Sequence, residues 1–141
     1  MFSGAFVHRV DEKGRLMIPP RFRASLGESF NITRGMGGCL WIFPADEWAE
    51  VVRKLEPKSL VDRSALALQR YFLGAASDGA LDPQGRLAIP PVLRDHAAIL
   101  HEVMVMGAGT RLEIWSRERW EQFDAELTED RLEQMGLEVG L

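Results

Sequence analysis

The sequence has few of the residues that build covalent cross-links or metal sites. It contains one cysteine, Cys39, among 141 residues, so an internal disulfide and a cysteine cluster for metal binding are excluded. Cys39 precedes an apolar run and is expected to be buried. The three histidines, His8, His96 and His101, lack the spacing of metal ligands. We therefore expect neither a metal site nor a cofactor.

Long apolar runs and catalytic motifs are also missing. No apolar run approaches the roughly 18 residues that a membrane-spanning helix needs, and residues 1–4 lack the segments of a signal peptide. We expect a soluble, cytoplasmic protein without membrane contact. There is no nucleophile elbow, glycine-rich phosphate loop or Gly-Lys-Ser/Thr motif. Asp11 and Asp82 could act as an acid–base pair only if they met, so we expect no enzymatic activity.

The chain also lacks the net positive charge common in proteins that bind polyanions. It has 17 basic and 21 acidic residues, a net charge of -4. The charge is unevenly distributed, because residues 8–34 carry six basic and three acidic side chains, whereas residues 117–141 carry three basic and eight acidic ones. The chain is therefore basic near its start and acidic at its end.

The most informative feature of the sequence is a segment that occurs twice. Residues 11–23 recur as residues 82–94, with Asp, Gly, Arg, Leu, Ile, Pro, Pro and Arg identical at eight of thirteen positions. The similarity extends to both sides: Phe2-x-Gly4-Ala5 recurs as Phe72-x-Gly74-Ala75, Leu40-x-Ile42 as Leu112-x-Ile114, and Trp48 as Trp120. A tandem two-fold repeat follows. Each half of roughly 70 residues would be marginal alone, so the two halves are expected to share one core.

Each copy of the segment predicts the same local structure. A strand over residues 2–10 leads into a tight turn in which Asp11 accepts amide hydrogen bonds and Gly14 supplies a positive φ. Residues 15–18 are expected to return as the second arm of a hairpin, which places Arg15 at its tip. Two prolines then start a helix over residues 20–26, from which Arg23 is expected to face outward.

The remaining residues predict an α+β fold with a mainly β core. Strands are expected at 30–33, 39–43, 86–89, 103–106 and 112–115, and helices at 46–55, 59–74, 91–97 and from 116 onward. The acidic residues after Thr128 are expected to be frayed or disordered. We divide the chain into a first module (5–47), a helical bridge (48–75), a second module (76–119) and a C-terminal helix with an acidic tail (120–141).

The repeated Asp-x-x-x-Arg pair has two interpretations. As an exposed ion pair that stabilises a turn, it contributes under about 1 kcal/mol. As a binding element, an arginine at a hairpin tip suits phosphate or guanine through its planar set of donors. The recurrence of the surrounding residues favours binding. Two-stranded ribbons can enter the DNA major groove, and two ribbons related by a pseudo-two-fold axis would present Arg15 and Arg86 together.

Other basic residues surround the first turn. Lys13 and Arg15 are the leading DNA contacts, and Arg9, Arg21 and Arg23 are candidate phosphate contacts. The second copy has Gln84 where the first has Lys13, so the two copies are expected to contact DNA unequally. Trp41, Trp48, Trp115 and Trp120 could stack on single strands, but they lie on the apolar periodicity and are expected to pack in the core or at an interface.

These motifs resemble the bacterial MraZ family, whose modules belong to the SpoVT-AbrB group. The family signature falls on Asp11, Gly14 and Arg15, and again on Asp82, Gly85 and Arg86. The resemblance implies swapped-hairpin modules that form a pseudo-dimer within one chain, and assembly into a closed homo-oligomeric ring. It also implies a transcriptional regulator of the cell division and cell wall gene cluster that binds repeated promoter elements of its own operon and associates with the nucleoid. The alternative is a protein-interaction module, antitoxin-like or a ring scaffold, with little direct DNA binding.

Overall fold

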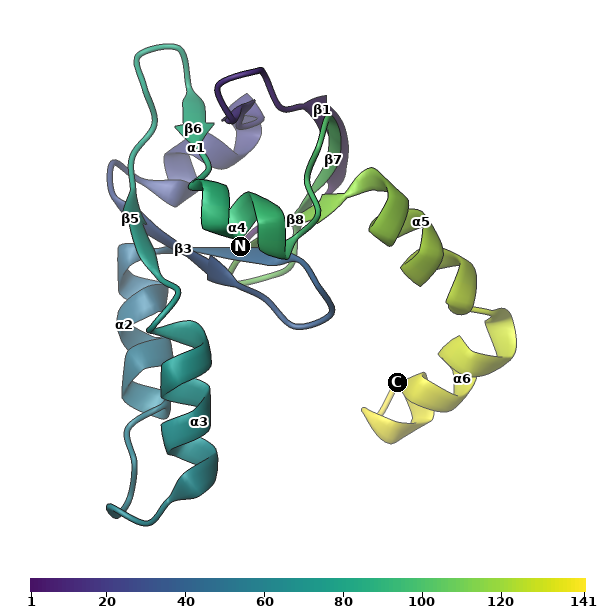
Figure 1. The fold of residues 1–141 in the computed structure, drawn as a ribbon. Coiled ribbons are helices and arrows are strands. Elements are labelled where there is room, and N and C mark those ends of the chain that lie inside the picture. The colour runs from purple at the N-terminus through teal and green to yellow at the C-terminus, as the bar shows by residue number, and fades with distance from the viewer.

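The computed structural model describes residues 1–141 and contains the same succession of elements twice (Figure 1). The first repeat contributes β1 (Ala5–Arg9), β2 (Arg15–Met17), α1 (Pro20–Leu26), β3 (Phe30–Arg34), β4 (Leu40–Pro44), α2 (Ala45–Lys54) and α3 (Arg63–Phe72). The second contributes β5 (Ser77–Gly79), β6 (Arg86–Ala88), α4 (Pro91–His96), β7 (Glu102–Gly107), β8 (Leu112–Ser116), α5 (Arg117–Glu126) and α6 (Glu129–Glu138). The predicted α+β class is confirmed, and most elements lie close to their predicted bounds.

The end of the chain differs from the expectation of a frayed tail, because it forms α6. The Thr128 hydroxyl caps this helix by accepting a hydrogen bond from the amide of Arg131, and Glu129 and Asp130 lie in its first turn, where the helix dipole favours negative charge. Acidic residues therefore support the start of this helix. Since α6 follows α5 as α3 follows α2, a helix pair ends each repeat.

The two repeats interleave in one antiparallel six-stranded sheet, in the order β1-β7-β8-β4-β3-β5. The first strand of each repeat pairs with a strand of the other repeat: β1 with β7, and β5 with β3. A pseudo-two-fold axis passes between β4 and β8, where Trp41 lies opposite Glu113 at the centre of the paired residues. This exchange of strands confirms the pseudo-dimer that the sequence predicted.

The arms of the predicted hairpin separate directly after the turn. Val10 and Leu16 form a single bridge, after which β1 continues to β7. Strand β2 instead pairs with β6 of the second repeat, with Leu16 opposite Leu87. The hairpin prediction was thus wrong beyond its tip. Both repeats carry the same apolar pattern, so the local sequence specifies a strand with one buried face but not its partner.

The core lies between the six-stranded sheet and a second layer made of α1, α4 and the two-stranded β2–β6 ribbon. Its 19 buried residues come from both repeats. At its centre, Leu16 and Leu87 are 0% and 1% exposed. The repeats therefore share one core, as expected for halves too small to fold separately.

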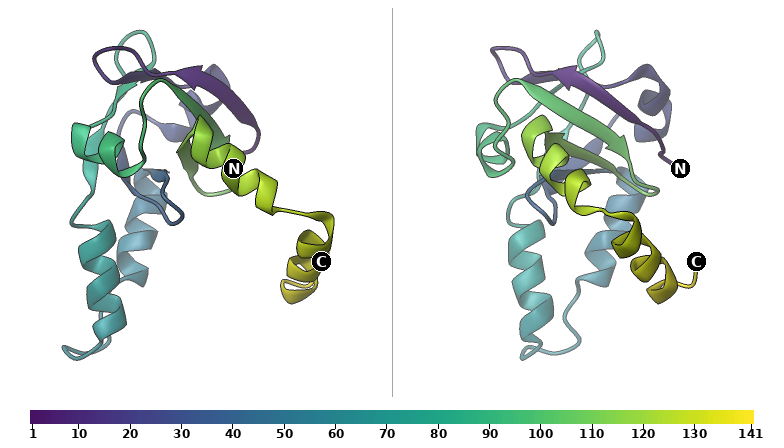
Figure 2. Two further views of the ribbon diagram at one scale, coloured as in Figure 1. Left: turned by 45° about the vertical axis from the view of Figure 1, so that its right-hand side comes forward. Right: turned by 90° about the vertical axis from the view of Figure 1, so that its right-hand side faces the viewer.

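Helices α2, α3 and α5 pack on the other face of the sheet (Figure 2). Trp41 of β4 stacks on Phe72 of α3, with ring centroids 5.4 Å apart, and Trp115 of β8 packs against Trp120 and Phe123 of α5. These contacts agree with the packing role expected for the tryptophans. No helix combines the length and the apolar composition needed to span a lipid bilayer.

Candidate nucleic-acid interface

The turn between β1 and β2 is held together by one carboxylate. Oδ1 of Asp11 accepts hydrogen bonds from the backbone amides of Lys13 and Arg15, both at 2.9 Å. The Asp11 amide donates to the Arg15 carbonyl, and Gly14, with φ +76°, donates its amide to the Asp11 carbonyl. Aspartate and glycine are needed here because the carboxylate satisfies two turn amides and the backbone adopts a left-handed conformation.

The turn between β5 and β6 has the same geometry. Oδ1 of Asp82 accepts hydrogen bonds from the amides of Gln84 and Arg86, again at 2.9 Å, and Gly85 has φ +80°. Since Gln84 is neutral, the second turn carries one basic side chain fewer than the first. The first turn also has the acidic Glu12 where the second has Pro83, so the two turns match in backbone structure and in net charge but differ in the number of charged side chains.

In each turn the aspartate also orients the arginine. Nε of Arg15 donates to Oδ2 of Asp11 at 2.7 Å, and Nε of Arg86 donates to Oδ2 of Asp82 at 2.7 Å. The terminal nitrogens of both guanidinium groups make no hydrogen bond within the chain. Each therefore presents a fixed set of N–H donors to an external acceptor.

Hydrogen bonding keeps the two turn carboxyl groups ionised. The hydrogen bond from the Arg15 amide, followed by that from its side chain, holds the pKa of Asp11 below its ordinary value. The corresponding hydrogen bonds from Arg86 lower the pKa of Asp82. Both groups are carboxylates at neutral pH and act as acceptors only.

The β2–β6 ribbon brings the two arginines together on one surface. Leu16 and Leu87 point into the core, so Arg15 and Arg86 belong to the opposite, outward face. Arg15 lies opposite Ala88 and Arg86 opposite Met17, which makes the arginines diagonal neighbours with Cα atoms about 7–8 Å apart. Both turns project from the side of the molecule opposite α2 and α3 (Figures 1 and 2). One ribbon shared by both repeats thus replaces the two ribbons hypothesised from the sequence.

Three other candidate contacts have different surroundings. Lys13 is exposed at the tip of the first turn. The side chain of Arg9 is 72% exposed and lies 3.7 Å from a carboxylate oxygen of Glu102. Arg21 lies against the rings of Phe6 and Phe22, with Cζ 5.8 and 5.6 Å from their centroids. Lys13 is therefore free to extend. Arg9 is exposed but ion-paired with Glu102, and Arg21 is held against the surface of β1 and α1.

Arg23 does not face outward as expected. It is half-buried, its Nε donates to the carbonyl of Ile18 at 2.8 Å, and its guanidinium lies against Gly85 of the other turn. The equivalent Arg94 lies against Gly14. Sequence reasoning gave Arg94 no role, although its identity with Arg23 in the repeated segment was visible.

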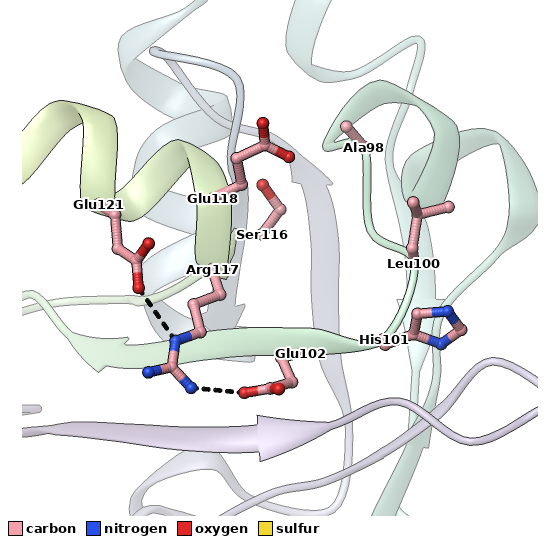
Figure 3. Close-up of a pocket in the computed structure, with 8 residues that line it drawn as sticks. All are labelled: Ala98, Leu100, His101, Glu102, Ser116, Arg117, Glu118 and Glu121. Atoms are coloured by element: carbon pink, nitrogen blue, oxygen red, sulfur yellow. Dashed lines mark hydrogen bonds and ion pairs between the residues drawn. The ribbon is translucent and has the colours of Figure 1, made fainter.

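A pocket beside α5 is predominantly acidic, unlike the arginine-bearing face of the β2–β6 ribbon (Figure 3). It has a volume of about 450 Å³, and three glutamates but only one arginine line it. Arg117 is already bound to Glu102 and Glu121, which leaves Glu118 unneutralised. This pocket disfavours phosphate groups, so the ribbon face is the better candidate for a polyanion. No group of three or more His, Cys, Asp or Glu side chains is placed to hold a metal ion.

Comparison with known proteins is consistent with the internal duplication. The profile of the family described as "MraZ protein, putative antitoxin-like" matches residues 1–71 and again residues 72–136. The chain is 45% identical to "Transcriptional regulator MraZ" of Heliobacterium modesticaldum over 88% of this chain and 87% of that protein. It is 43% identical to the protein of that name from Limosilactobacillus reuteri over 100% of this chain and 99% of the relative. A further relative of that name, from Alkaliphilus oremlandii, is 41% identical over the whole of both chains.

Proposed function

The chain belongs to the MraZ family, and we propose that it is a transcriptional regulator that binds double-stranded DNA sequence-specifically. The observation that carries the proposal is the ribbon with two identically oriented arginines, Arg15 and Arg86. Its proposed targets are repeated promoter elements of the cell division and cell wall gene cluster, including its own promoter. The proposed location is the cytoplasm, in association with the nucleoid.

The geometry of the ribbon supports binding in the major groove. A two-stranded ribbon fits a groove about 12 Å wide, and an arginine with free terminal nitrogens can bind guanine or phosphate through two hydrogen bonds. Lys13 and Arg9 add phosphate attraction beside the first turn, whereas Gln84 adds none beside the second. The first repeat therefore contributes more of the affinity than the second.

Self-association would offset the unfavourable net charge of -4. Several weakly binding protomers on regularly spaced DNA repeats gain affinity through effective concentration. We therefore propose a closed homo-oligomeric ring in which each protomer contacts the next through two different surfaces.

Two ends of the molecule suit such a contact. The connection between α2 and α3 exposes Leu60 and Val61, which are 94% and 82% exposed, and residues 53–63 carry four basic and two acidic side chains. Helix α6 exposes Leu132 and Leu137, and residues 126–138 carry five acidic and one basic side chain. The two surfaces are both apolar and opposite in charge, so one protomer can dock α6 on the next. Removal of residues 129–141 should lower the mass in light scattering, and an unchanged mass would exclude this contact.

Footprinting on the upstream DNA, with titrations at several salt concentrations, tests DNA binding. Arg15→Ala should weaken binding sharply and lower the slope of log K against log salt by about one. Arg70→Ala is the matched control, because Arg70 is an exposed arginine of α3, a helix on the side of the molecule opposite the two turns. Near-wild-type affinity and slope for Arg15→Ala, with assembly intact, would remove Arg15 from the mechanism.

The exposed apolar surface of α6 also favours a second candidate function, a protein-interaction module. In that case a stoichiometric protein partner should co-purify with the chain. Binding to the upstream DNA should then be absent or independent of salt.

A further inference from the structure

Each repeat places an arginine against the glycine of the other repeat's turn. A methyl group added at Gly14 would lie 2.6 Å from Cζ and 2.8 Å from Nε of Arg94. A methyl group at Gly85 would overlap Cζ of Arg23 and lie 2.6 Å from its Nε. The glycines of the signature are therefore required both for a positive φ and for space under an arginine from the other repeat.

A backbone hydrogen bond accompanies each of these contacts. The amide of Ile89 donates to the carbonyl of Gly14 at 2.9 Å, and Nε of Arg94 donates to the carbonyl of Ile89 at 3.0 Å. The Gly14 carbonyl is thus held by the amide of Ile89, whose own carbonyl is bonded by Arg94 from the last turn of α4. In the second turn, the amide of Ile18 donates to the carbonyl of Gly85 at 3.0 Å, and Arg23 bonds the carbonyl of Ile18. The first repeat therefore holds the second turn through the equivalent groups.

We propose that Arg94 positions Arg15, and that Arg23 positions Arg86, so that each repeat sets the recognition arginine of the other. The peptide group after Gly14 carries the Arg15 amide, which donates to Asp11. Movement of Gly14 therefore changes the amide hydrogen bond and the guanidinium direction of Arg15 together. The effect on DNA recognition rests on the proposed function, whereas the positioning itself does not.

This assignment changes the role expected for Arg23. A phosphate contact requires donors directed away from the protein, but Arg23 donates to the Ile18 carbonyl and to the sulfur of Met17. Arg94 makes the equivalent bond to Ile89. Both are positioning residues, each acting through a glycine of the neighbouring turn.

Hydrogen exchange of the turn amides tests the positioning without DNA. Arg94→Ala should reduce the protection of the Lys13 and Arg15 amides by about tenfold and leave Gln84 and Arg86 unchanged, because protection reports local opening. Arg23→Ala should have the converse effect. Arg94→Lys, which keeps the charge but loses the planar group, guards against a variant that does not fold and should act like Arg94→Ala. Equal changes in both turns, or changes in the turn of the mutated repeat, would overturn the proposal.

A second measurement compares the cost of a methyl group at each turn. Gly14→Ala should lower the melting temperature much less in an Arg94→Ala background than in the wild type. Removal of the Arg94 side chain relieves the clash with the added methyl group, so that only the strain of the positive φ remains. Gly27→Ala is the control, since Gly27 has φ +81° and no atom within 4 Å of an added methyl group, and its effect should not depend on Arg94. Additive effects of Gly14→Ala and Arg94→Ala would contradict the contact.

Titration of DNA onto the double variant links positioning to recognition. If Arg94 acts through Arg15, Arg94→Ala should weaken binding in the wild type and have no further effect in Arg15→Ala. If Arg94 contacts phosphate directly, the two losses multiply, and the proposed role in recognition is wrong. Absence of DNA binding by the wild-type chain would defeat the proposed function but leave the exchange result standing.

Discussion

Leu87→Ala tests whether the two repeats unfold as one unit. Leu87 is 1% exposed and pairs with Leu16, which is fully buried, so the substitution removes core contacts with the other repeat. Loss of a buried leucine side chain in a close-packed core costs about 3–5 kcal/mol, because transfer and cavity costs add. For a chain of this length, that cost corresponds to a fall in melting temperature of roughly 10 °C or more.

Tryptophan signals from both repeats allow the measurement. Trp41 and Trp48 belong to the first repeat, and Trp115 and Trp120 to the second. Fluorine NMR of the 5-fluorotryptophan-labelled chain in urea follows each residue separately. Because the core is shared, all four signals should move to the same lower midpoint in Leu87→Ala.

Two transitions would refute this reasoning. If the signals of Trp41 and Trp48 kept the wild-type midpoint while those of Trp115 and Trp120 shifted, the repeats would be separate folding units. Leu100→Ala is the matched control, because Leu100 is 79% exposed and its loss should change the midpoint little. The experiment is run at several protein concentrations, since association adds concentration-dependent stability.

Three further predictions concern single groups. The pKa values of Asp11 and Asp82 are lowered in the folded chain, so both carboxylates stabilise the fold above the unfolded pKa of about 3.9, and this contribution is lost as the pH falls through the folded pKa. In a plot of the urea unfolding midpoint against pH, the variant with both aspartates replaced by asparagine should therefore show a smaller fall on the acid side than the wild type. Thr33→Val should lower the free energy of unfolding in urea by about 1–3 kcal/mol, because the buried hydroxyl donates to the Phe72 carbonyl at 2.6 Å. Thr33→Ser keeps the hydroxyl and should retain most of the stability. Burial raises the pKa of the Cys39 thiol to about 12. Near neutral pH this thiol should therefore react with a disulfide reagent far more slowly in the native chain than in urea, and equal rates would contradict its burial.

Local chemistry explains what the sequence could predict. Proline at the start of α1, aspartate and glycine in the turns, and apolar periodicity in α2 each act within a few residues, so the elements lie near their predicted positions. The turn geometry around Asp11 and Arg15 was predictable for the same reason. The partner of β2 was not predictable, because its apolar pattern fits a hairpin with β1 as well as the observed pairing with β6 of the other repeat.

The environment of Arg23 shows a second limit. Its place on α1 suggested an outward side chain, but the contact that holds it is Gly85, 62 positions away in the sequence. Recurrence of Arg23 as Arg94 marks the position as important without revealing what each arginine touches. Long-range contacts of this kind require knowledge of how the repeats interleave.

The pairing of Trp41 with Glu113 at the pseudo-two-fold axis shows what joining two halves in one chain permits. In a dimer of identical subunits, a residue on the axis must face its own copy, so tryptophan would meet tryptophan and glutamate would meet glutamate. Here the two positions carry different residues, tryptophan and glutamate. Cζ of Arg111 lies 4.4 Å from the centroid of the Trp41 ring, and a terminal nitrogen of the same guanidinium donates to the Glu113 carboxylate at 2.8 Å. A symmetric homodimer cannot make such a mixed contact, whereas two repeats in one chain can, because their sequences are free to diverge in charge and to contribute unequally to one binding surface.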